Sequence, residues 1–350
     1  MPTGSSDPDV LLDWILNSMG LVRRSGWSET KDQNSAIQRI MREALLPEPL
    51  RGWDYNEIGN HTGLSKTGIH HQMAKLKDCG LVSTKVEGKW HRHLLRGGSM
   101  SAAVGLVKSE ATAVLKMRLK EASQMIEHSE TRMATEIEED PIPFQIQISE
   151  LGPIGDVSDS ISALVCDLGL AGGSPRSGGK LARDVLEELC TNHHPTTILA
   201  LSEKLSESRG RVVTVVDRMR SAGFVERVPM ISRLPQDIFS GLVRQLNARG
   251  EGWLMTRGGL GRLEESVSSS LVSAAGKGGL TIETVTDILS PVPIQDQRVL
   301  LNTLGGRMPY GVRMAGSDGN AVSQRVSRQA DRTLRRIMTV SERLDEALSE

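Results

Sequence analysis

The chain has 350 residues, with 42 Lys and Arg against 43 Asp and Glu and a formal net charge of −1. Its 38% hydrophobic content and its three cysteines without a CxC or CxxC pair are typical of a soluble globular protein in a reducing compartment, and they exclude a histone-like binder or a disulfide scaffold. The length allows two or three domains, and the lack of a signal-peptide pattern or a membrane-spanning apolar run predicts a cytoplasmic protein with no membrane partner.

The chain begins with two short predicted helices. Asp7 and Pro8 open the first, which ends at Gly20 and is followed by a polar linker. The second is expected from Ser35 to about Leu45 and would be the first helix of a domain. Residues 1–34 are therefore an N-terminal helix and linker, and residues 35–98 form the first domain.

The most informative stretch runs from residue 54 to residue 95 and reads as helix, turn, helix and two-stranded hairpin. Gly63 suits the turn, and Ser65 is a good N-cap for the following helix. On that helix Ile69, Met73 and Leu76 recur at helical spacing and form one buried stripe. The opposite face carries small, polar and cationic groups, which suit a major groove: Lys66, Thr67, His70, His71, Ala74 and Lys75.

This stretch resembles the ArsR/MarR-like winged-helix regulators and covers roughly a fifth of the chain. The residues that carry the resemblance are Ile58, Gly63, Leu64, Ser65, Ile69, His71, Leu76, Gly80, Leu81 and Val82. The resemblance implies that bases or nearby phosphates are contacted by Ser65, Lys66, Thr67, His70 and His71, and that the DNA backbone is contacted from the wing by Lys85, Lys89 and Arg92.

Local charge favours this interpretation over a winged helix that is used only for protein contacts. Residues 65–96 contain seven Lys and Arg against Asp78 and Glu87, a local net charge of +5. Such a patch on a nearly neutral protein is typical of a phosphate-binding surface, to which Lys75 also contributes.

Two long amphipathic helices are expected outside this domain. The first runs from residue 99 to about Glu139, with its stripe continued through Met133 after a one-residue shift. The second runs from Ala321 to Leu348. Each stripe has two interpretations, a self-association helix or a helix packed on a neighbouring domain of its own chain.

A diverged second copy of the domain follows. Met19, Gly20 and Leu21 match Leu168, Gly169 and Leu170, and a constant offset of 143 pairs core positions such as Ile69 with Val212 and Gly80 with Gly223. Helices are expected at residues 181–190, 198–205 and 209–222. Residues 208–233 have a net charge of +4, and the second copy's DNA contacts would be Arg209, Arg211, Thr214 and Arg218.

The second copy is not chemically equivalent to the first. Its outward positions are Gly210, Val213, Thr214 and Asp217, so we expect it mainly to clamp phosphate or to bind protein. Its wing is interrupted by a predicted helix at residues 235–248, and residues 252–258 are similar to the strand that precedes the closing helix of many winged-helix regulators. Trp253 would pack that wing, and Trp90 the first.

The sequence contains no complete motif for nucleotide binding, metal binding or catalysis. The segment from Gly172 to Leu181 resembles a phosphate loop, but Leu181 replaces the Ser or Thr that would bind magnesium, so a flexible linker is expected. His91 and His93 share a face of one strand, but the thiolate pair of metal-sensing relatives is missing. We therefore predict no enzyme activity, no cofactor and no metal.

These inferences predict a mainly α fold with small β-wings, in which two winged helix-turn-helix domains are joined by a long helix and followed by a C-terminal amphipathic helix. The remaining segments are a long linker or dimerisation helix (99–140), a linker with a strand candidate at 144–148 and a short helix (141–180), the second domain (181–275), a helical segment (276–318) and the last helix (319–350). The predicted function is a transcription regulator that binds double-stranded DNA as a homodimer, with base readout mainly by the first domain and with a small-molecule effector or protein partner left open. The alternative is a tandem winged-helix scaffold for protein–protein interaction or chromosome architecture.

Overall fold

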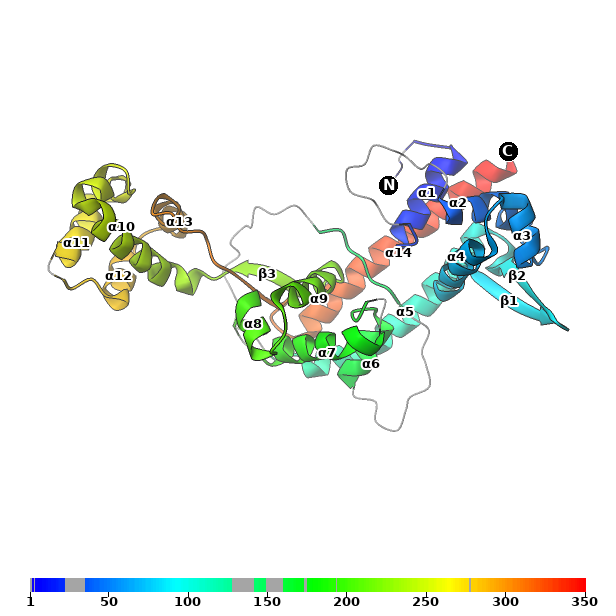
Figure 1. Ribbon diagram of the computed structural model, residues 1–350, viewed down its shortest axis with the longest axis horizontal. Helices are drawn as coiled ribbons and strands as arrows, with labels where there is room; N and C mark the ends of the chain where they lie inside the picture. The colour runs from blue at the N-terminus through cyan, green and yellow to red at the C-terminus, as the bar shows by residue number, and fades with distance from the viewer. Residues whose placement is uncertain are drawn as a thin grey trace.

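The computed structural model describes residues 2, 4–22, 35–127, 142–148, 160–172, 175–192, 194–276 and 278–350. These residues contain fourteen α-helices and two antiparallel sheets of two strands each (Figure 1). Their buried apolar side chains form three separate cores. The first includes Leu11, Ile69 and Val104, the second includes Leu168, Val216 and Val326, and the third includes Leu242, Leu289 and Leu301. No helix in the described part of the chain is long and apolar enough to cross a membrane.

The first unit is a set of short helices followed by a hairpin and a long helix. Its elements are α1 (Pro8–Ser18), α2 (Ala36–Ile40), a π-helical turn η1 (Met41–Leu45), α3 (Tyr55–Thr62), α4 (Lys66–Asp78), β1 (Val82–Glu87), β2 (Trp90–Leu95), the 3-10 turn η2 (Arg96–Gly98) and α5 (Met100–Met125). Asp54 caps α3 by accepting hydrogen bonds from the backbone of Asn56 and Glu57. The turn between α3 and α4 is possible because Gly63 adopts a positive φ of 64°.

The second unit repeats this order. Its elements are α6 (Ser160–Asp167), α7 (Pro175–Thr191), α8 (Ile198–Lys204), α9 (Arg209–Ser221), β3 (Val225–Pro229), β4 (Tyr310–Met314) and α14 (Gly319–Ser349). Both α4 and α9 have 13 residues and start 143 positions apart, as do β1 and β3. Even a single bridge is repeated, because Trp53 pairs with His93 and Thr196 pairs with Val312.

The prediction for the second strand of the second unit's wing is wrong. β3 pairs with β4 through the register Val225↔Met314 to Pro229↔Tyr310, so the two paired strands lie far apart in the sequence. The long helices α5 and α14 start 219 positions apart. The offset between the long helices exceeds the offset of 143 between α4 and α9 by 76 residues, so the second hairpin holds 76 more residues than the first.

This insertion is a helical unit with its own core (Figure 1). It contains η3 (Ile231–Arg233), α10 (Leu234–Thr256), η4 (Leu260–Arg262), α11 (Glu265–Gly276), α12 (Ile282–Leu289) and α13 (Ile294–Thr303). Residues 252–256, expected as a strand, continue α10 beyond a kink at Gly250. Trp253 packs against this third core and not against a hairpin, and the side chain of Arg249 lies 4.6 Å over its ring.

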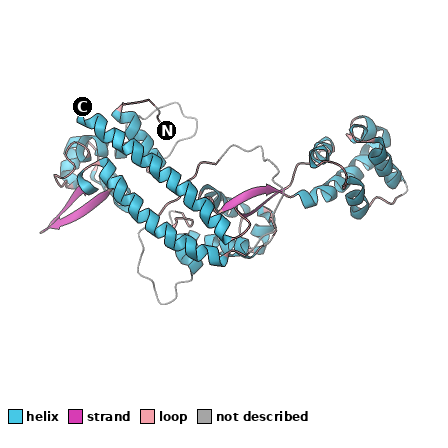
Figure 2. Cartoon of the chain, turned by 180° about the vertical axis from the view of Figure 1, so that it is seen from behind, coloured by secondary structure: helices cyan, strands magenta, loops and turns pink. Residues whose placement is uncertain are grey.

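The long helices α5 and α14 run antiparallel and pack along each other (Figure 2). The apolar stripes expected for self-association are largely buried within the chain: Val104 and Ile337 lie in the first core, and Leu119 and Val326 lie in the second. Leu348, at the end of the second stripe, is 47% exposed. The carboxylate of Asp345 near the end of α14 accepts hydrogen bonds from the first amides of α5, those of Met100 and Ser101.

The packing of the two units is reciprocal. α1 packs on α14, the long helix of the second unit, and α6 packs on α5, the long helix of the first. The turns after α1 and α6 also match, because Gly20 and Gly169 adopt φ angles of 71° and 65°. Each unit therefore places its first helix on the long helix of the other.

Three further expectations differ from the structure. The segment expected as a flexible linker lies largely in α7, which already begins at Pro175. The strand expected at residues 144–148 forms no sheet, although the Gln145 amide donates to the Ser221 carbonyl at 2.9 Å. α5 ends at Met125, short of the expected end, while Met133 lies outside the described residues.

Candidate nucleic-acid interface

The two faces of α4 differ as the sequence predicts. Ile69, Met73 and Leu76 are fully buried in the first core. Ser65 caps the helix by accepting a hydrogen bond from the Gly68 amide at 3.2 Å. The structure brings five of the predicted contact residues together on the exposed side of this helix start, namely Ser65, Lys66, Thr67, His70 and His71.

The β1–β2 hairpin projects beyond the helices beside α4 (Figure 1). Its strands pair in regular antiparallel register from Val82↔Leu95 to Glu87↔Trp90, with Gly88 and Lys89 at the turn. Lys85 and Lys89 are exposed. Trp90 was expected to pack the hairpin, but it is 56% exposed, and Val86 of the paired strand is 67% exposed.

Among the described residues, Lys66, Lys85 and Lys89 form no ion pair, so their charges are available to an external anion. Lys75, on the last turns of α4, is half-buried. Arg92 has partners within the protein, because its guanidinium lies 2.9 Å from the Glu57 carboxylate and 3.5 Å from that of Asp54. Arg92 therefore ties β2 to the start of α3.

An aromatic stack lies between the hairpin and the helices, and the sequence did not reveal it. The His93 ring is 2% exposed and stacks on Tyr55 with ring centroids 4.7 Å apart. Its Nδ1 lies 2.9 Å from the Thr84 hydroxyl. Tyr55 in turn meets His70 edge to face at 5.6 Å, so the stack supports a side chain of the exposed α4 surface.

Burial, assisted by the nearby charge of Lys77, lowers the pKa of His93 to about 4. The ring is therefore neutral near pH 7 and is a structural group, not a phosphate contact. His91, two residues earlier on the same strand, is exposed. The alternation of the two histidines gave no indication that one of them is in the core.

The second unit presents a smaller cationic surface on α9. Val212, Val216 and Met219 are buried, while the predicted outward positions Gly210, Thr214 and Asp217 are exposed. Arg209 is exposed and forms no ion pair within the described residues.

Two other predicted contacts of α9 have partners in the protein. Arg211 lies 2.5 Å from the Glu207 carboxylate. Arg218 is half-buried and donates to the Leu170 carbonyl at 2.8 Å, and burial lowers its pKa. A Cβ on Gly172 would collide with this guanidinium, which shows how closely the α6–α7 turn is packed on α9. Arg218 therefore holds the second unit together.

The second hairpin also differs in charge and in its ending. Glu226 on β3 lies 2.6 Å from Arg313 and 3.1 Å from Arg325, so its carboxylate pairs with both cations and offsets one of their two positive charges. The guanidinium of Arg227 lies 4.1 Å over the Tyr310 ring. Beyond this pair the strands continue into the inserted helices, so the second hairpin has no tight turn like that at Gly88.

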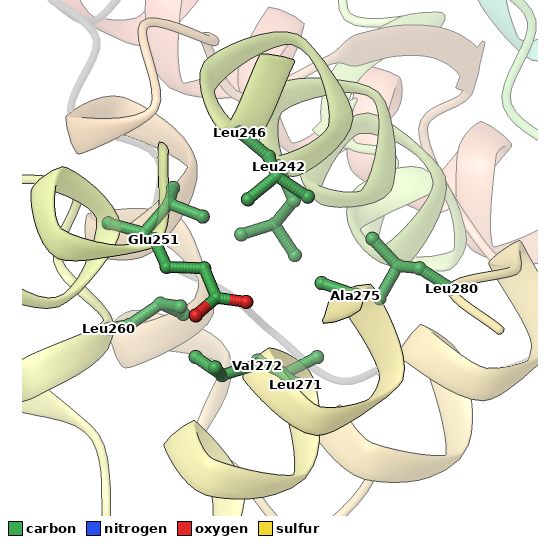
Figure 3. Close-up of a pocket in the computed structure, with 9 residues that line it drawn as sticks. Leu242, Leu246, Glu251, Leu260, Leu271, Val272, Ala275 and Leu280 are labelled. Atoms are coloured by element: carbon green, nitrogen blue, oxygen red, sulfur yellow. The ribbon is translucent and has the colours of Figure 1, made fainter. Parts of the chain in front are cut away.

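The enclosed pit of the inserted unit does not offer a competing site, while a wider, open groove of about 820 Å³ lies between α5 and α14 and is lined by side chains such as Leu119, Lys120 and Leu334. The pit in the inserted unit, drawn in Figure 3, has a volume of about 10 Å³ and is lined mostly by apolar side chains such as Leu242, Leu254 and Leu271. That space is about the size of one water molecule. No group of three His, Cys, Asp or Glu residues in the described ranges could hold a metal ion.

No protein-family model, curated protein or solved structure is significantly similar to this chain.

Proposed function

We propose that the chain is a sequence-specific DNA-binding transcription regulator, in which the first and second units are winged helix-turn-helix domains and α4 is the main base-reading helix. The observation that supports this proposal best is the exposed surface of α4 and the β1–β2 hairpin, which carries Lys66, Lys85 and Lys89 together with Thr67 and His70 on a protein whose net charge is −1.

The mechanism follows from the chemistry of these side chains. The lysines replace counterions on the phosphates and supply affinity that falls with salt. Thr67, His70 and His71 are short enough and polar enough to reach base edges once α4 lies in a major groove. Each good base contact would contribute about 1 to 3 kcal/mol of discrimination.

One observation favours the scaffold alternative. Val86 and Trp90 expose apolar side chains at the hairpin tip, which suits a protein partner better than a phosphate backbone. A scaffold would not need the unpaired lysines on the same surface, so DNA binding is the better-supported proposal.

The test is a fluorescence-anisotropy titration of random duplex DNA at about 50 and 200 mM salt, with the double variant Lys66→Ala, Lys89→Ala. We expect weaker binding and a salt slope that is smaller by about 2, because each lysine contact contributes about one unit of slope. The control is Lys116→Ala, Lys120→Ala, which removes the same charge from exposed positions of α5.

The control should bind like the natural chain. Equal effects of both double variants would show that only net charge matters and would reject α4 and its hairpin as the DNA surface. No binding of any duplex at low salt would reject DNA binding altogether and favour the scaffold.

A further inference from the structure

The expected homodimer interface is already satisfied inside one chain. The stripes of α5 and α14 bury Val104, Leu119, Val326 and Ile337 against each other and against the two cores. Because α1 packs on α14 and α6 packs on α5, each unit completes the other as two protomers of a symmetric dimer would. Within the described residues, most of the apolar stripe of each long helix is therefore covered by the chain itself.

The same arrangement places both exposed helices on one side of the long pair. Figure 1 draws α4 and α9 in front of α5 and α14, and Figure 2, seen from behind, draws the long helices in front. This is what a two-fold rotation perpendicular to α5 and α14 produces, since such a rotation keeps each element at its height along the axis. A single ligand on that side can meet both helices.

The separation of the units suits duplex DNA. Ala103 of α5 lies in the first core and Ala122 lies in the second. At a rise of 1.5 Å per residue they are about 29 Å apart, and the whole helix is about 39 Å long. One turn of B-DNA, about 34 to 36 Å, lies between these limits and separates successive major grooves on one face of a duplex.

The two helices would nevertheless read different sequences. α4 presents Lys66, Thr67 and His70. α9 presents Arg209 and Thr214, together with Asp217, whose carboxylate lies 3.2 Å from Arg220. Lysine and arginine suit guanine, while a carboxylate accepts a hydrogen bond from cytosine N4. Only the first hairpin ends in a free cationic turn, because the second continues into the inserted unit.

We propose that one chain, acting as an internal pseudo-dimer, binds a bipartite duplex site whose two unlike half-sites lie one helical turn apart. This inference rests on the proposed function. It adds that the complex contains one chain per duplex, that the site is not a palindrome, and that the inserted unit marks one end of it.

The experiment selects bound duplexes of about 30 base pairs from a random pool, then determines stoichiometry by native mass spectrometry and protection by hydroxyl-radical footprinting. We expect one chain per duplex and two protected stretches of different sequence, with centres about 10 base pairs apart. Lys66→Ala should weaken protection of one stretch, and Arg209→Ala should weaken protection of the other.

A spacing variant tests the geometry without changing the protein. Inserting about 5 base pairs between the stretches turns one half-site to the opposite face of the duplex, whereas about 10 base pairs restores the face but doubles the distance. We expect both insertions to lower affinity by about 100-fold, because the second contact loses its effective concentration.

The outcomes separate the two proposals. Two chains on a palindromic site would overturn the pseudo-dimer and leave DNA binding intact. A single protected stretch unaffected by Arg209→Ala would do the same. Failure of every duplex in the pool to bind at low salt would overturn the proposed function and the pseudo-dimer with it.

Discussion

His93 shows how a single residue positions the candidate DNA surface of the first unit. Its ring stacks on Tyr55, hydrogen-bonds with Thr84 and is 2% exposed. Its backbone also exchanges two hydrogen bonds with Trp53, so one residue joins β2 to the segment before α3. Burial and the nearby charge of Lys77 oppose a positive charge at this position more than the Asp54 carboxylate favours it, which is why the neutral ring is favoured.

The consequence is a stability that depends on pH. Since burial lowers the His93 pKa to about 4, the unfolded chain binds more protons than the folded chain between that value and about 6.5. The free energy of unfolding is therefore highest above about pH 6.5 and decreases as the pH falls from there towards about 4. Between pH 7.5 and pH 5 we expect a loss of about 2 kcal/mol from this residue.

Urea unfolding of the first unit at the two pH values, with His93→Gln and the exposed control His91→Gln, measures this loss. His93→Gln should be less stable at pH 7.5 but should show the smaller change towards pH 5. His91→Gln should keep the pH dependence of the natural chain. An equal pH dependence in all three proteins would mean that His93 is not the group responsible.

At the scale of elements, the contact between α5 and α6 depends on a buried charge. Arg118 of α5 is 8% exposed and lies 2.5 Å from Asp167, the last residue of α6, and 2.7 Å from Glu121. These carboxylates raise the pKa of Arg118 despite its burial. Because burial removes water from both partners, neither charge can lose the other at low cost.

We expect Asp167→Asn to destabilise the docking of α6 by about 3 kcal/mol, since it leaves the Arg118 charge with a weaker partner. Hydrogen–deuterium exchange should become faster in α6 and α7. Asp331→Asn is the matched control, because it removes the partner of exposed Arg335 and should leave exchange unchanged. Unchanged exchange in Asp167→Asn would show that apolar packing alone holds α6.

Local sequence patterns predicted the elements that are determined locally. Ser65 and Gly63 marked the start of α4 and the turn before it, and the spacing of Ile69, Met73 and Leu76 identified its buried face. The offset of 143 predicted α8, α9 and β3. The capping, turn and spacing signals lie within a few residues of the helices that they specify.

Partners that are distant in sequence were not predictable in this way. β4 at Tyr310–Met314 has no local turn that joins it to β3, so its pairing depends on the fold of 80 intervening residues. The ion pairs of Arg92 and the hydrogen bond of Arg218 likewise join segments far apart, so the sequence did not reveal these partners. α10 resumes after the kink at Gly250 and passes Gly252, and Leu254 beyond them is buried in the third core.

At the scale of the whole molecule, the inserted unit is an independent addition to a pseudo-symmetric protein. Residues 230–309 replace what is a four-residue tip, residues 87–90, in the first hairpin. Pro229 and Tyr310 face each other at the end of the β3–β4 register, as Val86 and His91 do in β1–β2. The ends of the insertion are thus as close together as the ends of a tight turn.

This geometry predicts that the insertion can be removed. Replacing residues 230–309 with a tetrapeptide copied from residues 87–90 should leave β3 paired with β4 and the first two cores intact, because the third core shares no residue with them. In thermal unfolding we expect one transition to disappear and the remaining stability to change by about 1 kcal/mol or less, since loop length affects closure only weakly.

DNA affinity of the shortened chain then distinguishes two roles for the insertion. If the insertion makes no contact with the DNA, the shortened protein should bind the selected site with the affinity of the natural chain. A loss of affinity with the fold retained would place the insertion in contact with DNA at its end of the site. Collapse of the second unit, seen as loss of both its transition and its α9 protection in hydrogen exchange, would contradict the independence of the third core.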